Sequence, residues 1–487
     1  MTGFLPILIL ATSLVPAAIT FFLGQESYRL RNALNLGGAL AKVALIVAML
    51  LAVAGGASFE TAIPLAPGLV LLFRIDALAL LFVSLSALLW LLTTIYAISY
   101  LGTKPEQSRF FGFFSLCVFA TTGIALSGSL ISFFIFFELL TLSTWPLVAH
   151  KQDAASLRAA RGYLLYALPC STILLVAIVW LESATGPILF TDRPDLSGVD
   201  PVSLRVIFGM FIIGVGMKAA ILPLHGWLPA AMVAPAPVSA LLHAVAVVKA
   251  GAFGVIRVIY DVFGIDTVTE LQVGMPLAAL ASVTIIWGSL RALQQSEIKK
   301  RLAYSTVSQV SYIVLGVALA SPFAVIGGLA HLVHQGLMKI TLFFCAGIYD
   351  ERAGVRSIEG LDGLGRRMPW TSTCFSIGAL GMIGLPPIAG FVTKIYLGIG
   401  GLQAEAPWVL AVLGASTLLN AAYFVPLLYR LWFRDPAPDA EADEAGPALV
   451  GPAVAAALAA VLAGMLAASD ISPLGWATLI AERDYLR

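Results

Sequence analysis

The chain has 487 residues, of which 60% are hydrophobic and only 11% are charged, and its mean hydropathy is +0.95. A soluble domain of this composition would expose apolar surface on every side, so the composition indicates a polytopic membrane protein. The net charge of +1 points to no particular partner, and we expect no binding of nucleic acid.

Apolar runs long enough to cross a membrane recur along the whole chain, separated mostly by short polar or Gly/Pro connections, so they favour helices over barrel strands. The first run has neither a basic start nor an obvious small-residue cleavage site, so we expect a span there and not a signal peptide. We predict fourteen spans, over residues 4–22, 33–54, 76–100, 110–127, 129–149, 161–183, 206–224, 237–261, 272–292, 303–321, 323–347, 370–397, 407–429 and 447–468.

Lys and Arg are divided unequally between alternate loops, and loops rich in these residues stay on the cytoplasmic side. One set of alternate loops holds most of the 28 Lys and Arg residues. The bias predicts an even number of spans in the plasma membrane, with both termini outside. The other set of loops holds only Arg74, Arg193, Arg205, Arg257, Arg483 and Arg487.

The second span contains Lys42, which lies near one end of the predicted range, so we expect its ammonium to reach the interface. Four further lysines lie inside spans: Lys218, Lys249, Lys339 and Lys394. Each charge costs about 2.5–3.5 kcal/mol at a helix centre on insertion scales, so intramembrane charge usually marks a functional pathway.

The fifth span carries Glu138, the only carboxylate that we expect deep inside a span. A lone glutamate in hydrocarbon takes up a proton, whereas a neighbouring lysine keeps it charged. Glu138 is therefore the natural partner of one buried lysine. Such a lysine keeps its proton beside the carboxylate and releases it when the pair separates, which is the behaviour needed by a proton pump or antiporter.

Helix breaks accompany the lysines of the seventh, eighth and twelfth spans. Irregular backbone at membrane depth is tolerated only where protein buries it or where it lines a watery cavity, and broken helices beside titratable groups are typical of transporters. The breaks are marked by Pro223 and Pro229 after Lys218, by Pro235 and Pro237 before Lys249, and by Pro386, Pro387 and Gly390 before Lys394.

The seventh and twelfth spans lie five apart and share one central lysine and one proline break. Their likeness suggests two five-helix repeats within an all-α polytopic membrane protein. We predict a three-helix N-terminal scaffold over residues 1–109, repeats over 110–262 and 270–434, and a last span over 447–468.

All five histidines lie in or at the ends of spans. His331 and His334 share a helix face and could relay protons in series, with His243 as a further relay candidate. A satisfied buried histidine is the alternative for His150 and His225. Metal binding would need further Cys, Asp or Glu ligands nearby, and the four cysteines show no CxxC spacing, so we expect no metal, no disulfide and no cofactor.

Four segments resemble the antiporter-like subunits shared by respiratory complex I, membrane-bound hydrogenases and Mrp-type multisubunit cation/proton antiporters. The resemblance covers most of the chain and implies fourteen helices with two inverted five-helix repeats. It also implies other membrane subunits as partners. The segments are LPLHGWLPAAMVAPAPVSALLHAVAVVKAG, KKRLAYSTVSQVSYIVLG, HLVHQGLMKITLFFCAG and GLPPIAGFVTK.

The resemblance assigns roles along a horizontal polar axis. It makes Glu138 and Lys218 the proton-exchanging pair and Lys394 the terminal group, and it makes Lys249 the central relay. The eleventh span supplies His331, His334 and Lys339, although His334 and Gln335 occupy positions that are often Asn and His in the family.

Within the family, the resemblance favours the D-type subunit of Mrp antiporters, which exchange protons for a monovalent cation, with Na⁺ expected. The alternative is a proton-pumping subunit of a complex I or hydrogenase-like redox assembly, in which other subunits supply the energy. A membrane enzyme acting on lipids or quinones would need a nucleophile or metal at an interface, whereas the titratable groups here lie at mid-depth. A purely structural subunit would have no use for buried lysines.

Overall fold

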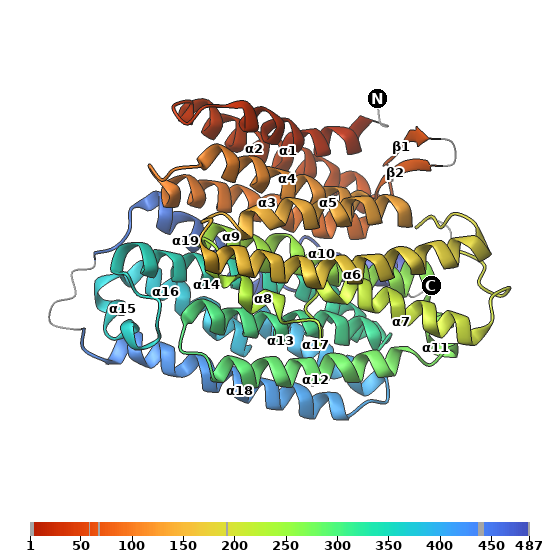
Figure 1. Ribbon diagram of the computed structural model, residues 1–487. Coiled ribbons are helices and arrows are strands. Elements are labelled where there is room, and N and C mark those ends of the chain that lie inside the picture. The colour runs from red at the N-terminus through yellow and green to blue at the C-terminus, as the bar shows by residue number, and fades with distance from the viewer. Residues whose placement is uncertain (1–3, 58, 67–68, 191–192, 437–442, 486–487) are drawn as a thin grey trace.

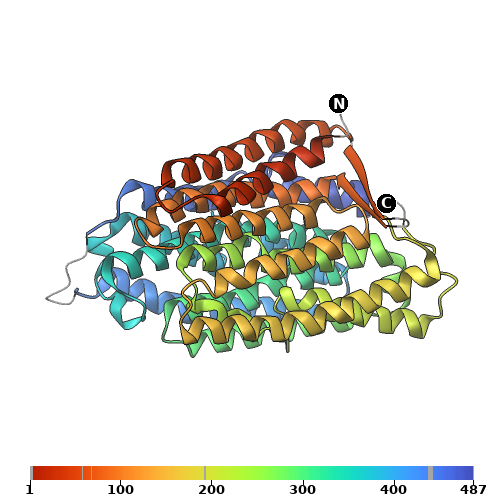
Figure 2. The ribbon, with the colours of Figure 1, turned by 45° about the horizontal axis from the view of Figure 1, so that its top comes forward.

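The computed structural model describes residues 4–57, 59–66, 69–190, 193–436 and 443–485. They form a bundle of helices lying roughly side by side, with α1 (Leu5–Phe22) and α2 (Tyr28–Ala54) at one edge and α12 (Gly274–Leu293) and α18 (Trp408–Phe433) at the other (Figure 1). Figure 2 shows the same N-terminal edge after rotation. The predicted all-α polytopic membrane class is confirmed. Arg487 lies outside the described residues.

A short hairpin interrupts the N-terminal helices, where the sequence analysis placed only a connection. Strands β1 (Phe59–Ala66) and β2 (Leu69–Ile75) pair antiparallel, and α3 (Ala77–Leu101) follows. The strands are too short to resemble spans, which is why the hydropathy pattern did not reveal them. Asp76 then caps α3, because its carboxylate accepts the backbone N–H of Ala79 at 2.7 Å.

The next part of the chain contains two interrupted spans. The first, α7, ends at Lys218 and not at the predicted residue 224, because Pro223 disfavours helix in the residue before it and Ala220 has a φ of 56°. The elements are α4 (Gln107–Leu126), α5 (Leu130–Val148), α6 (Ala154–Thr185), α7 (Pro201–Lys218), α8 (Trp227–Ala230), η2 (Ala231–Val233), α9 (Ala236–Ala240), η3 (Leu241–Val245), α10 (Val247–Arg257), η4 (Val258–Phe263) and α11 (Ile265–Glu270).

The last part contains the third interrupted span, which is split into two helices as predicted. The split lies at Gly384, whose φ is 93°. After α12 the elements are α13 (Ile298–Ala318), α14 (Pro322–Ala353), η5 (Glu359–Leu361), α15 (Leu364–Arg367), α16 (Pro369–Ile383), α17 (Ala389–Gln403), α18, α19 (Pro447–Met465), α20 (Pro473–Ile480) and η6 (Ala481–Tyr485).

Twelve helical segments among the described residues are long and apolar enough to cross a membrane, against fourteen predicted spans. The two predicted spans outside this set are α13 and the α16–α17 pair. Helix α13 is rich in buried hydroxyl and amide side chains, and α16 and α17 have 15 residues each, about 22 Å of helix. The count of fourteen and the two repeats stay predictions.

The cation-rich loops meet at one end of the bundle. Lys104 pairs with Glu351 at 2.7 Å, and Arg109 donates to the carbonyl of His150 at 2.7 Å. At the opposite end in Figure 1 lie the marked N and C termini, as an even number of crossings requires. These contacts place the loops together, whereas their cytoplasmic orientation remains a prediction.

The expectation that Lys42 reaches the interface is wrong. Its side chain is fully buried, and its ammonium donates to Ser13 at 3.0 Å and to Thr122 at 2.7 Å. The face of Trp90 lies 4.9 Å from the same nitrogen. Helix α2 extends from Tyr28 to Ala54, so Lys42 lies near its middle and cannot reach either end.

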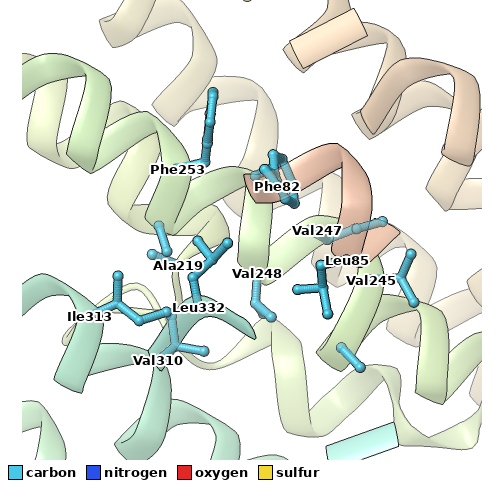
Figure 3. Packing of buried hydrophobic residues seen from close by; sticks show 14 of the residues in the cluster. Phe82, Leu85, Ala219, Val245, Val247, Val248, Phe253, Val310, Ile313 and Leu332 are labelled. Atoms are coloured by element: carbon cyan, nitrogen blue, oxygen red, sulfur yellow. The ribbon is translucent and has the colours of Figure 1, made fainter. Parts of the chain in front are cut away.

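The apolar core lies where α3, α10, α13 and α14 meet the end of α7. Figure 3 shows this packing, in which Phe82 of α3 faces Phe253 of α10 with ring centroids 4.9 Å apart. Leu332 of α14 lies close to Ala219 and Val310 in the same view. The ends of α7 and α10 are therefore held within a closely packed region.

Candidate functional site

The candidate site is a row of buried polar side chains that starts at α5 and α7. Glu138 accepts the hydroxyl of Ser171 on α6 at 2.5 Å. Lys218 is 1% exposed and donates to the backbone carbonyl of Phe137, the residue before Glu138. The predicted partners are thus neighbours, but no ion pair joins them.

The end of α7 lies directly against α10. A Cβ at Gly251 would approach the backbone nitrogen of Ala219 to 2.1 Å, so only glycine allows this contact. The indole N–H of Trp227 donates to the carbonyl of Met217 at 2.9 Å and satisfies one carbonyl left free by the helix end. These two contacts therefore stabilise the end of α7 at Lys218.

Lys249 precedes Gly251 by two residues and is fully buried. Its ammonium makes no hydrogen bond to any described residue. The break that precedes it lies at Ala246, with φ −116° and ψ −82°, between η3 and α10. A polar group buried without a partner is costly, so Lys249 stands out among the buried side chains.

The histidines of α14 continue the row. His334 Nδ1 lies 2.8 Å from the hydroxyl of Thr393 on α17, while His334 Nε2 has no partner among the described residues. Neither ring nitrogen of His331 makes a well-formed hydrogen bond within the described chain, nor does the amide of Gln335. The ring of Tyr312 lies 5.3 Å from that of His331.

His243 and Lys339 lie beside this row. His243 is fully buried in η3 with its ring 4.5 Å from Phe343, and neither of its nitrogens has a partner in the described part of the chain. Lys339 donates to the hydroxyl of Ser305 and to the carbonyl of Leu302, the latter at 3.1 Å. Lys339 is thus held by hydrogen bonds to α13, whereas His243 is held by packing against an aromatic ring.

Lys394 lies at the far end of the row, on α17. Its ammonium donates to the carbonyl of Ile383 at 2.5 Å and to the hydroxyl of Thr417 at 2.8 Å. Ile383 is the last residue of α16, where a cation is favoured by the free carbonyls of the helix end. The ring of Tyr312 lies 5.9 Å from the ammonium, between Lys394 and His331.

The sequence analysis missed Tyr312, Ser171 and Thr417, which contact the predicted groups. Tyr312 is fully buried, and its hydroxyl makes no well-formed hydrogen bond to a described residue, although it interacts with the side chain of Ser416. It lies within one of the segments that carry the family resemblance, but a single tyrosine among apolar residues gives no distinct sequence signal. Only the packing of α13 against α14 and α17 identifies it.

A second charged cluster corrects two expectations. Arg257 was expected in a loop but is 3% exposed, and it donates to Asp76 at 3.1 and 2.9 Å and to Asp261 at 2.9 Å. Asp261 is buried within a candidate span, so Glu138, which is only half-buried, is not the only carboxylate inside a span. The i, i+4 spacing of Arg257 and Asp261 was the available signal.

No group of three or more His, Cys, Asp or Glu side chains that could hold a metal ion occurs among the described residues. The four cysteines are buried and unpaired. The groups brought together at the centre are ammonium, imidazole, hydroxyl and carboxylate, which donate and accept protons.

Known proteins are similar to this chain over most of its length. The family described as "NADH:quinone oxidoreductase/Mrp antiporter, TM" matches residues 127–420. The chain is 36% identical to NADH-quinone oxidoreductase subunit N of Desulforudis audaxviator, over 77% of this chain and 75% of that one. It is 31% identical to the D subunit of a Na(+)/H(+) antiporter of Bacillus subtilis, over 72% and 71%. Hydrogenase-4 component B of Escherichia coli is 31% identical over 67% of this chain and 50% of its own length.

Solved structures share the fold. A chain of the Mrp complex from Dietzia sp. superposes with a TM-score of 0.89 at 23% identity, covering 99% of this chain and 98% of that one. A chain of respiratory complex I from Thermus thermophilus gives a TM-score of 0.84 at 24% identity, covering 98% and 99%.

Proposed function

This chain belongs to the NADH:quinone oxidoreductase/Mrp antiporter transmembrane family, and from this premise we propose that it translocates protons along its buried row of lysine and histidine side chains. The proposal rests on one observation, namely that several of these buried side chains lack hydrogen-bond partners. Lys249 and His243 make no hydrogen bond to a described residue, and neither ring nitrogen of His331 makes a well-formed one, although each side chain is almost fully buried. Buried polar groups normally have partners, so these positions suit proton exchange.

Glu138 and Lys218 begin the proposed path. Lys218 donates to the backbone carbonyl of Phe137, the residue before Glu138. A small rotation of the lysine side chain would therefore replace this hydrogen bond with one to the carboxylate of Glu138. Paired with the carboxylate, the lysine holds its proton. Separated from it, the lysine passes the proton towards Lys249.

Lys249 and the α14 histidines relay the proton, and Lys394 ends the path. Tyr312, between His331 and Lys394, is placed to join the last step through its hydroxyl. In this proposal His243 and Lys339 belong to the relay as well, and no metal or cofactor takes part.

We further propose that the chain acts as the D-type subunit of an Mrp antiporter, together with other membrane subunits, in exchanging protons for a monovalent cation such as Na⁺. The 31% identity to the Bacillus subtilis antiporter protein over 72% of this chain supports this assignment. The loops rich in Lys and Arg would face the cytoplasm of a plasma membrane, with both termini outside.

The second candidate is a proton-pumping subunit of a redox complex. The 36% identity to subunit N of a NADH-quinone oxidoreductase favours it. The proton path would be the same, and the energy would come from electron transfer in other subunits.

Purification of the intact complex from native membranes in mild detergent, with its subunits identified by mass spectrometry, separates the two candidates. Small membrane subunits without flavin or iron–sulfur proteins would support the antiporter. A co-purifying redox arm would replace it with the redox-driven pump. A chain that purifies alone would contradict both assemblies.

A further inference from the structure

The charged cluster around Arg257 lies on the same short helix as Lys249. Helix α10 has 11 residues, from Val247 to Arg257, and π-helical turns lie on both sides of it. Lys249 is its third residue and Arg257 its last, so about 12 Å of helix separates them. A helix this short moves as one piece, so the contacts that fix Arg257 also fix the backbone of Lys249.

The contacts near Lys249 leave α10 some freedom to slide. The ammonium of Lys249 makes no hydrogen bond to a described residue, so it does not fix its own position. Gly251 and Gly254 face the end of α7, where an added Cβ would come within 2.1 Å of Ala219 N and 2.8 Å of Val215 Cγ1, respectively. Glycines let two helices approach closely but offer no side chain to interlock, so they resist separation more than sliding.

Arg257 supplies the directional contacts of this helix. Its side chain is 3% exposed and donates twice to Asp76, at 3.1 and 2.9 Å, and once to Asp261, at 2.9 Å. The rings of Phe190 and Phe253 lie 5.0 and 5.1 Å from the central carbon of the guanidinium. Charged hydrogen bonds weaken steeply as their distance and angle change, so this cluster resists both sliding and rotation of α10.

The two carboxylates differ in what they connect. Asp261 belongs to η4, which continues directly from α10, and its contact with the hydroxyl of Tyr485 is 3.4 Å long, too long to hold it firmly. Asp76 precedes α3, and its carboxylate also accepts the backbone N–H of Ala79 at 2.7 Å, which fixes it to that helix. Of the two ion pairs of Arg257, the one with Asp76 therefore ties α10 to another helix.

We propose that Arg257 is a positioning residue for proton transfer, and that its ion pair with Asp76 holds α10 at the height at which Lys249 meets the rest of the buried row. The role of Lys249 in this proposal rests on the proposed function, whereas the anchoring of α10 to α3 does not. Arg257 itself passes no proton, because a guanidinium stays charged in proteins.

Two substitutions of equal charge separate anchoring from charge balance. Asp76→Asn and Asp261→Asn each leave one carboxylate beside Arg257, so neither leaves a buried charge without its partner. Asparagine caps a helix as well as aspartate does, so Asp76→Asn preserves the start of α3. The matched control is Arg430→Lys, because the ion pair of Arg430 with Asp362 is also 2.9 Å long but lies at the end of α18.

Hydrogen exchange in the intact complex, read by mass spectrometry on peptides of α10, measures the anchoring independently of transport. We expect Asp76→Asn to speed exchange of the α10 amides by about tenfold or more, because charged hydrogen bonds between two helices are lost. Asp261→Asn and Arg430→Lys should leave this exchange nearly unchanged. Equal exchange of α10 in the two asparagine variants would overturn the anchoring, whatever their transport.

Initial transport rates of the same variants in membrane vesicles, measured in light and heavy water, test the consequence for Lys249. A misplaced ammonium slows proton transfer itself, so in Asp76→Asn we expect a rate about 10–100-fold lower and a larger ratio of the rates in light and heavy water than in the wild type. Arg257→Lys keeps the charge but loses the forked contact, so it should behave like Asp76→Asn. Asp261→Asn and Arg430→Lys should keep both the rate and the ratio.

The isotope ratio distinguishes positioning from a merely structural role. Loss of folded protein lowers the rate but leaves the ratio as in the wild type, so a low rate with an unchanged ratio in Asp76→Asn and Arg257→Lys would overturn the positioning role. Lys249→Ala is the reference for the proposed function. Normal transport by Lys249→Ala would refute the part of Lys249 in the proton path, whereas loss of transport there with normal transport in Asp76→Asn would overturn the positioning role alone.

Discussion

Lys218 and Lys394 both lie beside an interrupted helix and both donate to a backbone carbonyl, yet their surroundings differ. Lys218 is buried inside the bundle, and its hydrogen-bond acceptor is the residue before a carboxylate, whereas Lys394 donates to a carbonyl and a hydroxyl and lines an apolar groove between α17 and α18. The helix break positions each lysine, but its hydrogen-bond partners and charged neighbours determine which group can exchange a proton with it. Lys218 can exchange its proton with Glu138 of the same chain, whereas the hydrogen-bond partners of Lys394 are neutral groups.

The strongest test of this difference between the two lysines removes Lys218 or its neighbour Glu138. Lys218→Ala and Glu138→Ala should each abolish proton transport while the protein remains in the membrane, because each leaves a gap in the path. Transport is measured in inverted membrane vesicles with a pH-sensitive dye, and protein level by immunoblot. Lys151→Ala, in an exposed loop, is the control. Normal transport by both variants would refute the pair.

We expect the loss of Lys394 to reduce proton transport less than the loss of Lys218. In Lys394→Met, transport should fall by about two orders of magnitude, because one proton-transfer group is lost, but no carboxylate is left without its partner. Initial rates in the same vesicles test this expectation. A loss as complete as in Lys218→Ala would mean that the two ends of the path contribute alike.

The backbone contacts at the two breaks can be compared directly. Gly251→Ala forces a Cβ against the backbone of Ala219, so we expect a loss of about 1–3 kcal/mol in stability and slower transport, because Lys249 moves with α10. Gly384→Ala should also destabilise, because φ is 93° there. Thermal unfolding in detergent measures both.

Gly209→Ala is the control for these glycine variants, since a Cβ there meets nothing within 4 Å. Its melting temperature should equal or exceed that of the wild type, because alanine favours a helix over glycine. Equal melting temperatures for Gly251→Ala and Gly209→Ala would show that α10 can move away from α7 at no cost.

The smallest expected effect lies outside the spans. Burial, helped by the positive charges of Arg109 and Lys151, lowers the pKa of His150 to about 4. An unfolded histidine has a pKa of about 6.5, so the unfolded chain binds more protons between these values, and stability should fall as pH drops from about 6.5 to about 4.

His150→Gln should weaken this pH dependence of the melting temperature and leave the melting temperature at pH 8 nearly unchanged. Transport above pH 6.5 should be unaffected, because His150 is neutral there. An identical pH dependence in the variant would mean that other groups account for the acid sensitivity.

The membrane class, the positions of most helices and the candidate residues follow from the sequence alone. Long apolar runs must become helices in lipid, and a lysine such as Lys249 inside a run is rare enough to be noticed. The proline breaks beside Lys218 and Lys394 were visible for the same reason, because proline removes a backbone donor wherever it lies.

Only the tertiary structure decided which side chains meet. It buried Lys42 among hydroxyl groups, joined Arg257 to Asp76 at the start of α3, and brought the ring of Tyr312 close to both His331 and Lys394. Hydropathy measures each residue against lipid or water, whereas hydrogen bonds and ion pairs depend on which faces of separate helices pack together. That choice is made by close packing over the whole bundle, including contacts as tight as that of Gly251 with Ala219.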